Sequence, residues 1–313
     1  MNNLQASSRR HLVGSLMVLL GAVGFSAKAV LVRLAYAHGP QLDAVTLMAL
    51  RMLLSLPFFL GMVVWLHRRR RVPLPARREL GLIAMLGIMG FYVAGYLDFA
   101  GLAYIPAGLE RLILFLYPTL VVLFSALFYG RKVTLRTGAA LALSYAGTAV
   151  VLIQPSSVLP SQLLIGVPLV FGSAVVFALY LMLSGEQMQR SGSMVFTAYG
   201  MSAASFAAVA HFTLGHGVTA LDLPAQVYGL ALIMALLSTV LPAFLMHAGI
   251  HRIGAGRAAM LGATGPVFTL YLAWWFLGEP VGMAQLVGTA MILAGVLMIG
   301  RGPAGSRAAE RRP

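Results

Sequence analysis

Apolar runs of about 20 residues recur from one end of the chain to the other, and short polar segments separate them. A helix of that length crosses the hydrocarbon core of a bilayer. Composition agrees, because 60% of the residues are hydrophobic and 10% are charged, against about 25% charged in soluble proteins. We predict an all-α polytopic membrane protein with ten transmembrane helices, at residues 12–36, 43–66, 79–102, 106–129, 134–153, 163–184, 193–214, 224–249, 254–277 and 281–300.

The second half of the chain repeats the first at a distance of 148 residues, and each copy carries a proline within a predicted span, Pro118 and Pro266. Each repeat holds five spans, an odd number, so the second repeat enters the membrane from the opposite side. Such inverted repeats are typical of transporters that alternate between two faces. The predicted parts are a tail (1–11), a first repeat (12–153), a linker (154–162), a second repeat (163–300) and a tail (301–313).

The basic residues follow the predicted topology. Of the 22 Lys and Arg, 18 lie in the two tails or around the loops that follow the second, fourth, sixth and eighth spans. The positive-inside rule then places both termini in the cytoplasm of a bacterial inner-membrane protein. The net charge of +14 is thus a topology signal, and nucleic-acid binding is not predicted. The other loops hold no basic residue: 37–42, 103–105, 154–162, 215–223 and 278–280.

The first span has an alternative interpretation as a signal peptide. It follows Arg9 and Arg10, and Ala27 to Ala29 form an A-x-A-like cleavage site. Cleavage there would leave nine spans and remove the partner of the sixth span, so we keep the span as a transmembrane helix.

Charged residues inside the spans are the candidate functional site. Lys28, Arg51, Asp98, Glu110 and Arg111 all fall in the outer half of the predicted membrane. Each costs about 2.5–3.5 kcal/mol at mid-bilayer, so a role in function is the first hypothesis. Glycines at steps of seven residues from Lys28 indicate that it faces protein. The alternative is that these charges only pair as structural contacts, with Arg111 reaching outward to the interface.

The set has one excess positive charge, which favours a substrate that carries a carboxylate. Arg51 suits that role, because a guanidinium grips a carboxylate in bidentate fashion. The competing hypothesis is that Asp98 or Glu110 carries a coupling proton. Tyr180 is the repeat partner of Lys28 and ranks first among candidate aromatic walls of a binding pocket, which are Tyr92, Tyr96, Tyr180 and Tyr199.

Three segments resemble a known family: AGLERLILFLYP, AGRAAMLGATGP and the Gly278-Glu279-Pro280 turn. They are similar to the drug/metabolite transporter superfamily, in its ten-helix EamA-type branch. The resemblance implies that spans 1–4 and 6–9 line a central cavity with spans 5 and 10 outside it, and that Arg51 is the arginine usual in the second span. Arg131 stands where the repeat pattern would place an acid opposite Glu279, so we expect Glu279 only to end a helix. The acidic residue that four-helix multidrug relatives use in span 1 is absent, so their proton mechanism is not carried over.

Other chemistry finds little support. The chain has no cysteine, and His247 and His251 have Ala248 where a zinc protease would have Glu. We therefore predict no metal and no cofactor. The predicted function is a secondary transporter that exports small metabolites such as amino acids, with Pro118 and Pro266 as hinges beside the cavity. The alternatives are an intramembrane or lipid-modifying enzyme and a non-transporting membrane scaffold.

Overall fold

The computed structural model describes residues 2–130, 134–153 and 159–300. Arg131, the first part of the predicted linker (154–158) and the predicted C-terminal tail (301–313) lie outside these ranges. Within them every regular element is a helix, which confirms the all-α prediction. The longer α-helices are α1 (Asn2–His38), α2 (Ala44–Arg68), α7 (Leu135–Ile153), α8 (Pro160–Ser191), α9 (Ser193–Gly215) and α14 (Met283–Gly300).

The remaining spans are interrupted helices. The third and eighth contain short π-helical segments, η1 (Ile88–Val93) and η3 (Leu236–Val240), and a short 3₁₀ helix η2 (Val218–Leu221) precedes the eighth. The α-helical pieces of the interrupted spans are α3 (Arg77–Gly87), α4 (Ala94–Leu102), α5 (Ala107–Leu114), α6 (Tyr117–Tyr129), α10 (Ala225–Ala235), α11 (Leu241–Ile253), α12 (Ala255–Gly262) and α13 (Gly265–Leu277).

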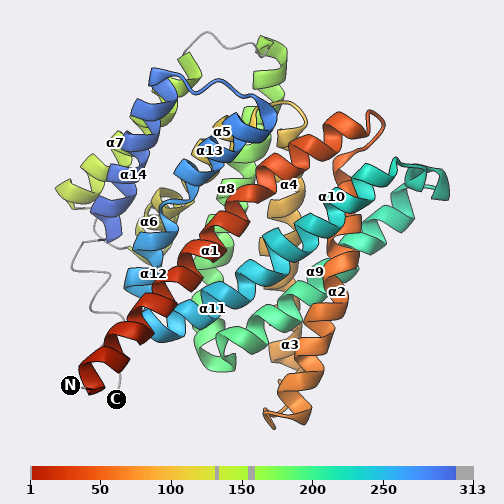
Figure 1. The fold of residues 1–313 in the computed structure, drawn as a ribbon, viewed down its shortest axis with the longest axis vertical. Helices are drawn as coiled ribbons and strands as arrows, with labels where there is room; N and C mark the ends of the chain where they lie inside the picture. Colours follow the sequence, from red (N-terminus) through yellow and green to blue (C-terminus); the bar gives the residue numbers. More distant parts are fainter. Residues whose placement is uncertain (1, 131–133, 154–158, 301–313) are drawn as a thin grey trace.

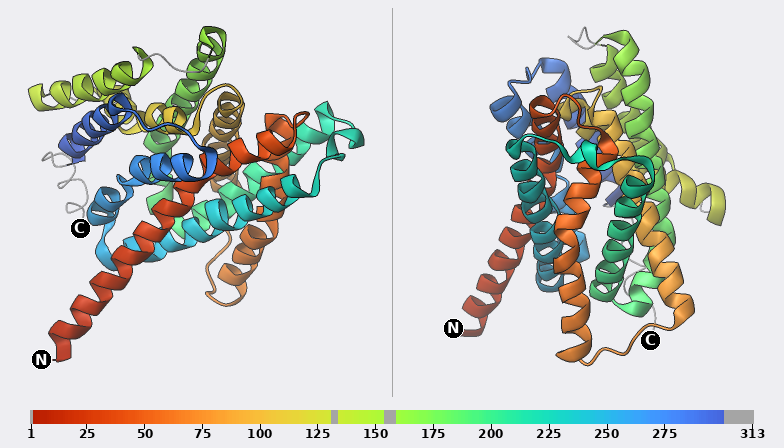
Figure 2. Two further views of the ribbon diagram at one scale, coloured as in Figure 1. Left: turned by 45° about the horizontal axis from the view of Figure 1, so that its top comes forward. Right: turned by 90° about the vertical axis from the view of Figure 1, so that its right-hand side faces the viewer.

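Eight helical stretches of the described chain are long and apolar enough to cross a membrane. The first begins at His11, although α1 itself is helical from Asn2, and its first turns project beyond the bundle (Figure 2). The other two predicted spans give shorter apolar helices, Gly265–Leu277 and Met283–Met298. The molecule is therefore a polytopic helical membrane protein.

The two halves of the chain have the same order of elements. The bounds of α3, α5 and α6 recur in α10, α12 and α13 with a shift of 148 residues. Each half also has its π-helical segment at the matching place, and α6 and α13 both end at a glycine with positive φ, Gly130 at 62° and Gly278 at 64°. The sequence repeat thus corresponds to a repeat of secondary structure.

Both mid-span prolines coincide with breaks. Pro118 has no N–H to bond the carbonyl of Leu114, and α5 ends at Leu114. Pro266 stands likewise at the start of α13, and α12 ends at Gly262. In the two breaks Thr119 and Thr264 donate side-chain hydrogen bonds to the carbonyls of residues 116 and 261, at 2.7 and 2.6 Å. Each helical piece before a proline thus ends four residues before it, at the carbonyl that the proline cannot bond.

The packing follows the repeat. α1 packs against α11 and α13, and α8 packs against α4 and α6, which are the corresponding helices of the other half. α2 packs against α9, while α7 and α14 form a pair at one edge of the bundle (Figure 1). Loops 39–43 and 278–282 lie at the top of Figure 1, and loop 69–76 lies at the bottom. These two ends are called the top and bottom ends below.

Candidate functional site

Three charged side chains predicted as site residues meet between α1, α4 and α5. The ammonium group of Lys28 contacts Asp98 Oδ2 and lies 3.7 Å from Glu110 Oε1. Asp98 and Glu110 are completely buried, and Lys28 is 17% exposed. The prediction that Lys28 faces protein is confirmed, and its contacts with the two acids are of the kind that the alternative of structural pairing expected. We call Lys28, Asp98 and Glu110 the buried triad.

Arg111 turns inward beside this triad. Its Nε lies 4.0 Å from Glu110 Oε2 and donates to Thr269 Oγ1 at 3.0 Å. Its Nη2 donates to the carbonyl oxygen of Phe25 at 2.8 Å. Arg111 thus joins α5 to α1 and α13, and the alternative that it reaches outward to the interface is wrong.

Arg51 is buried apart from the triad. Its Nη1 donates to Thr239 Oγ1 at 3.1 Å, and its Nη2 lies 3.0 Å from the sulfur of Met48. The guanidinium also stands over the ring of Phe99, 5.0 Å from its centroid. Among the described residues no carboxylate lies within 4.0 Å of Arg51, and its Nε has no hydrogen-bond partner. Arg51 is therefore a buried cation with an unused donor.

The predicted tyrosines occupy three separate places. The hydroxyl of Tyr92 contacts His211 Nδ1, and the ring of Tyr96 lies edge-on to the same histidine, with centroids 5.7 Å apart. Tyr199 bonds His67 Nε2 at 2.7 Å near the bottom end of α2. Neither histidine was predicted as a site residue, because each lies far along the chain from its tyrosine, 132 positions for His67 and 119 for His211.

Tyr180 does not line a cavity, contrary to its first rank among the aromatic candidates. It is 3% exposed and packs among the rings of Phe91, Phe177 and Phe196. Gly90 makes this packing possible, because a Cβ at that position would overlap the Tyr180 ring. The close approach of η1 to α8 fills the space that a pocket would need.

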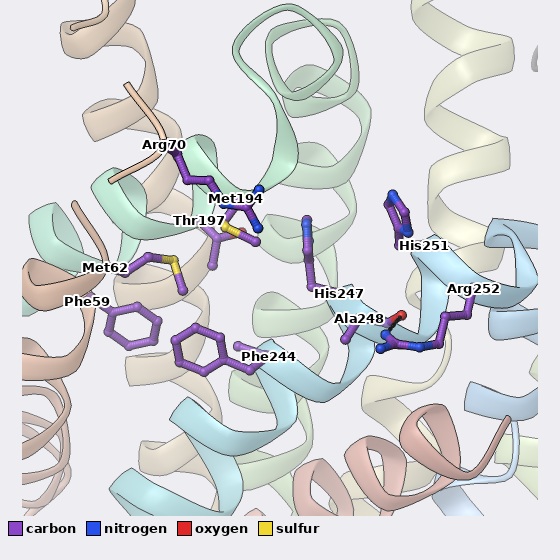
Figure 3. A pocket seen from close by; sticks show the side chains of 11 residues that line it. Phe59, Met62, Arg70, Met194, Thr197, Phe244, His247, Ala248, His251 and Arg252 are labelled. Atoms are coloured by element: carbon purple, nitrogen blue, oxygen red, sulfur yellow. Dashed lines mark hydrogen bonds between the residues drawn. The ribbon is translucent and has the colours of Figure 1, made fainter. Parts of the chain in front are cut away.

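A cavity of about 480 Å³ lies near the bottom end, between α2, α9 and α11 (Figure 3). His247, His251 and Arg252 lie on one side of it, and Arg70 lies on the other side, beside Met194 (Figure 3). His247 also lies 3.1 Å from Ser193 Oγ. None of the predicted site residues borders this cavity, and neither do Pro118 and Pro266, so the expected position of the prolines beside it is not observed. The lining residues are Phe59, Met62, Arg70, Met194, Thr197, Ala243, Phe244, His247, Ala248, His251 and Arg252.

Two helices lead from this cavity to Arg51. Along α2, Arg51 precedes Phe59 by eight residues, which is about 12 Å of helix at 1.5 Å per residue. Along the other chain segment, Thr239 precedes Ala243 by about one helical turn. The hydrogen bond between Arg51 and Thr239 therefore joins the two walls beyond the inner end of the cavity.

Glu279 has a larger role than the sequence predicted. Its Oε1 accepts a hydrogen bond from the backbone N–H of Ala107 at 2.8 Å, and its Oε2 accepts from Gly108 at 3.0 Å. These are two of the N–H groups that a helix leaves unpaired at its start. The carboxylate of the second half thus caps α5 of the first half, at the top end of the molecule (Figure 1).

A bundle of membrane-length apolar helices with buried ion pairs and a cavity at one end is the architecture of a membrane transporter. The model of the EamA-like transporter family matches residues 12–153 and 164–301. The chain therefore belongs to the EamA-like transporter family. It is a transporter of a small molecule and not an enzyme.

Curated relatives agree with this assignment. YcbK of Bacillus subtilis (strain 168), named an uncharacterized transporter, is 32% identical over 292 residues, which cover 91% of each chain. A probable terminal-alkyne amino-acid exporter of Streptantibioticus cattleyicolor is 29% identical over 250 residues, 76% of this chain and 79% of that protein. A protein of known crystal structure, 18% identical, superposes over 95% of this chain and 99% of its own with a TM-score of 0.63, which shows the fold alone.

Proposed function

We propose that this chain exports small carboxylate-bearing metabolites, such as amino acids, across a bacterial inner membrane by alternating access. It does so with ten transmembrane helices in two inverted five-helix repeats, at 12–153 and 163–300. The shared element order supports this architecture, and so does the packing, in which α1 with α11 mirrors α8 with α4. The pairing of α2 with α9 and of α7 with α14 is what a twofold axis between the halves requires.

The cavity is the observation that carries the proposal. Basic residues support a position on the cytoplasmic side, because Arg70 and Arg252 line the cavity and Lys and Arg concentrate in cytoplasmic loops. At the opposite side the buried triad and the Glu279 cap hold the helices together. This arrangement corresponds to a state that is open toward the cytoplasm, from which an exporter takes its substrate.

The chemistry of the wall favours an amphipathic anion. Phe59, Met62 and Phe244 suit an apolar side chain, and Arg252 with the neighbouring histidines attracts a negative charge. A lipophilic cation would meet like charges at this wall. The name of the Streptantibioticus relative, a probable amino-acid exporter, points to the same class.

Arg51 is the proposed anchor for the carboxylate. Its guanidinium lies beyond the cavity, is buried, and has a free Nε. A substrate carboxylate that replaced Thr239 would occupy Nε and an Nη in the planar bidentate arrangement that Lys does not offer. Because a hydrogen bond to a charged group contributes about 1.5–3 kcal/mol, losing it weakens binding roughly 10- to 100-fold.

A ligand screen by thermal shift on the purified protein tests the substrate class. L-leucine, L-phenylalanine and succinate represent carboxylates, and tetraphenylphosphonium represents lipophilic cations. We expect at least one carboxylate to stabilise the wild type, and Arg51→Gln and Arg51→Lys to lose most of that effect. Arg190→Gln should keep it, since Arg190 is exposed and donates to the exposed Glu186. Stabilisation by the cation alone, or an unchanged response of Arg51→Gln, contradicts the proposal.

Sidedness is tested separately. We expect reporter tags at residue 74 and at the C-terminus to report cytoplasm and a tag at residue 158 to report the outside. The natural absence of cysteine also permits Ala243→Cys as a single label site in the cavity wall. An impermeant maleimide should label it from the cytoplasmic side. Tags at 74 and 158 on one side would contradict the inverted repeat.

A further inference from the structure

The buried triad contains carboxyl oxygens that lack donors. Within the described chain Asp98 Oδ1, Glu110 Oε1 and Glu110 Oε2 have no hydrogen-bond partner, although both side chains are completely buried. Buried polar groups in native proteins are almost always paired, because an unpaired one loses its hydration without compensation. Three unpaired acceptors in one cluster therefore point to a missing donor.

The neighbouring donors do not reach these three oxygens. Lys28 contacts Asp98 Oδ2, and its 3.7 Å distance from Glu110 is too long for a hydrogen bond. Arg111 donates to Thr269 and to the Phe25 carbonyl, and it stays 4.0 Å from Glu110. Tyr36 on α1 donates to the carbonyl of Phe99 at 2.8 Å.

The remaining charged group near the acids also has other partners. Arg51 on α2 donates to Thr239 and contacts Met48. From α13, the second-half helix packed on α5, the residue that reaches this region is Thr269, and it accepts from Arg111. Although Arg51 Nε is free, no described side chain donates a hydrogen bond to these three oxygens.

We propose that Asp98 and Glu110 bind one proton between them, and that its binding and release are coupled to transport. The two carboxyl groups lie beside the same ammonium group, since Lys28 contacts Asp98 Oδ2 and is 3.7 Å from Glu110 Oε1. A proton on Glu110 lets that carboxyl donate to Asp98 Oδ1, so that one added proton provides the missing donor. Asp98 and Lys28 then form a one-to-one ion pair. The coupling rests on the proposed transport function, while the proton site does not.

The position of the triad explains how a proton can influence the conformation. Lys28, Asp98 and Glu110 all belong to the first half, on α1, α4 and α5, but α1 also packs against α11 and α13 of the second half. When the proton leaves Glu110, a carboxylate remains whose nearest cations are Lys28 and Arg111. Two carboxylates then compete for Lys28, which changes how α1 is held against α4 and α5, and α1 carries that change to α11 and α13 of the second half. The exporter would exchange a proton from outside for a substrate from inside.

Infrared spectroscopy of the purified protein tests the proton site without any substrate. We expect a carbonyl stretching band of a protonated carboxylic acid that shifts in D₂O, disappears at high pH and is missing in Glu110→Gln. The matched control Glu186→Gln, at an exposed glutamate 75% accessible, should keep the band. A wild type without such a band at any pH, or a band that survives in Glu110→Gln, overturns the proton site. The wild-type measurement is decisive even if Glu110→Gln does not fold.

Coupling is read in proteoliposomes that contain a pH-sensitive dye and are loaded with L-leucine. We expect proton movement opposite to leucine in the wild type. Glu110→Gln should lose the response of leucine movement to a pH gradient, because Gln cannot release a proton, whereas the exposed Glu186→Gln should respond as the wild type does. Leucine transport without proton movement overturns the coupling. If leucine is not transported at all, the proposed function fails while the infrared band still reports on the proton site.

Discussion

Removing the Glu279 carboxylate should loosen the top end of the molecule. Glu279 bonds the N–H groups of Ala107 and Gly108 at 2.8 and 3.0 Å, so Glu279→Ala leaves both without a protein acceptor. Loss of a helix N-cap costs about 0.5–2 kcal/mol, and the interaction of a carboxylate with the helix dipole adds about 0.3–1 kcal/mol. Since Glu279 is only partly buried, water replaces part of this, and we expect a loss of about 1–2 kcal/mol.

Thermal unfolding of the purified protein measures this effect. A change of that size lowers Tm by roughly 2–6 °C in a chain of this length. Glu279→Gln should show an intermediate loss, because its amide oxygen still accepts one bond. Glu186→Ala is the matched control, since its surface pair with Arg190 contributes at most about 0.5 kcal/mol. Equal Tm values for Glu279→Ala and Glu186→Ala would refute the capping role.

Three further predictions concern packing, hinges and pH. Gly90→Ala should destabilise the fold by about 1–3 kcal/mol, because its methyl would overlap the Tyr180 ring, whereas Gly81→Ala has open space on the same predicted span and should leave Tm unchanged. Pro118→Ala and Pro266→Ala should slow leucine transport more than they reduce folded yield, and a fully active double mutant would show that the breaks are only tolerated bends. Burial opposes ionisation of Asp43, but hydrogen bonds from Thr46 and His216 hold its pKa below the usual 3.8. The ionised carboxylate therefore stabilises the fold above pH 3.8, and this stabilisation is lost as the pH falls through the lowered pKa of the folded state. Asp43→Asn should flatten this part of the Tm–pH curve.

Much of the scaffold could be predicted from the sequence because its signals are local. Apolar runs, basic loops and the two prolines act within one helix, so the membrane class and the breaks after Leu114 and Gly262 were accessible. The pairing of Lys28 with Asp98 and Glu110 was accessible for a related reason. Charges in apolar runs are few, and each needs a partner in hydrocarbon.

The cavity and the cap could not be found in this way. Phe59, Met62 and Phe244 face a cavity, but the same residue types face lipid elsewhere on the helices. Glu279 lies 172 positions along the chain from Ala107. The repeat pattern was misleading, because Arg131 occupies the position of the first repeat that corresponds to Glu279. Sequence spacing likewise could not show whether the Tyr180 ring is packed or lines a cavity, because the close approach of Gly90 decides which of the two occurs.

Transport of labelled L-leucine by the purified protein in liposomes tests the central claim most directly. We predict uptake that is saturable, is reduced by unlabelled L-phenylalanine and not by tetraphenylphosphonium, and falls at least 10-fold in Arg51→Gln, while Arg190→Gln behaves as wild type. The variants must be equally monodisperse for the comparison to count. Wild-type liposomes that move the cation but none of the carboxylates, or full leucine uptake by Arg51→Gln, would contradict the proposed carboxylate exporter.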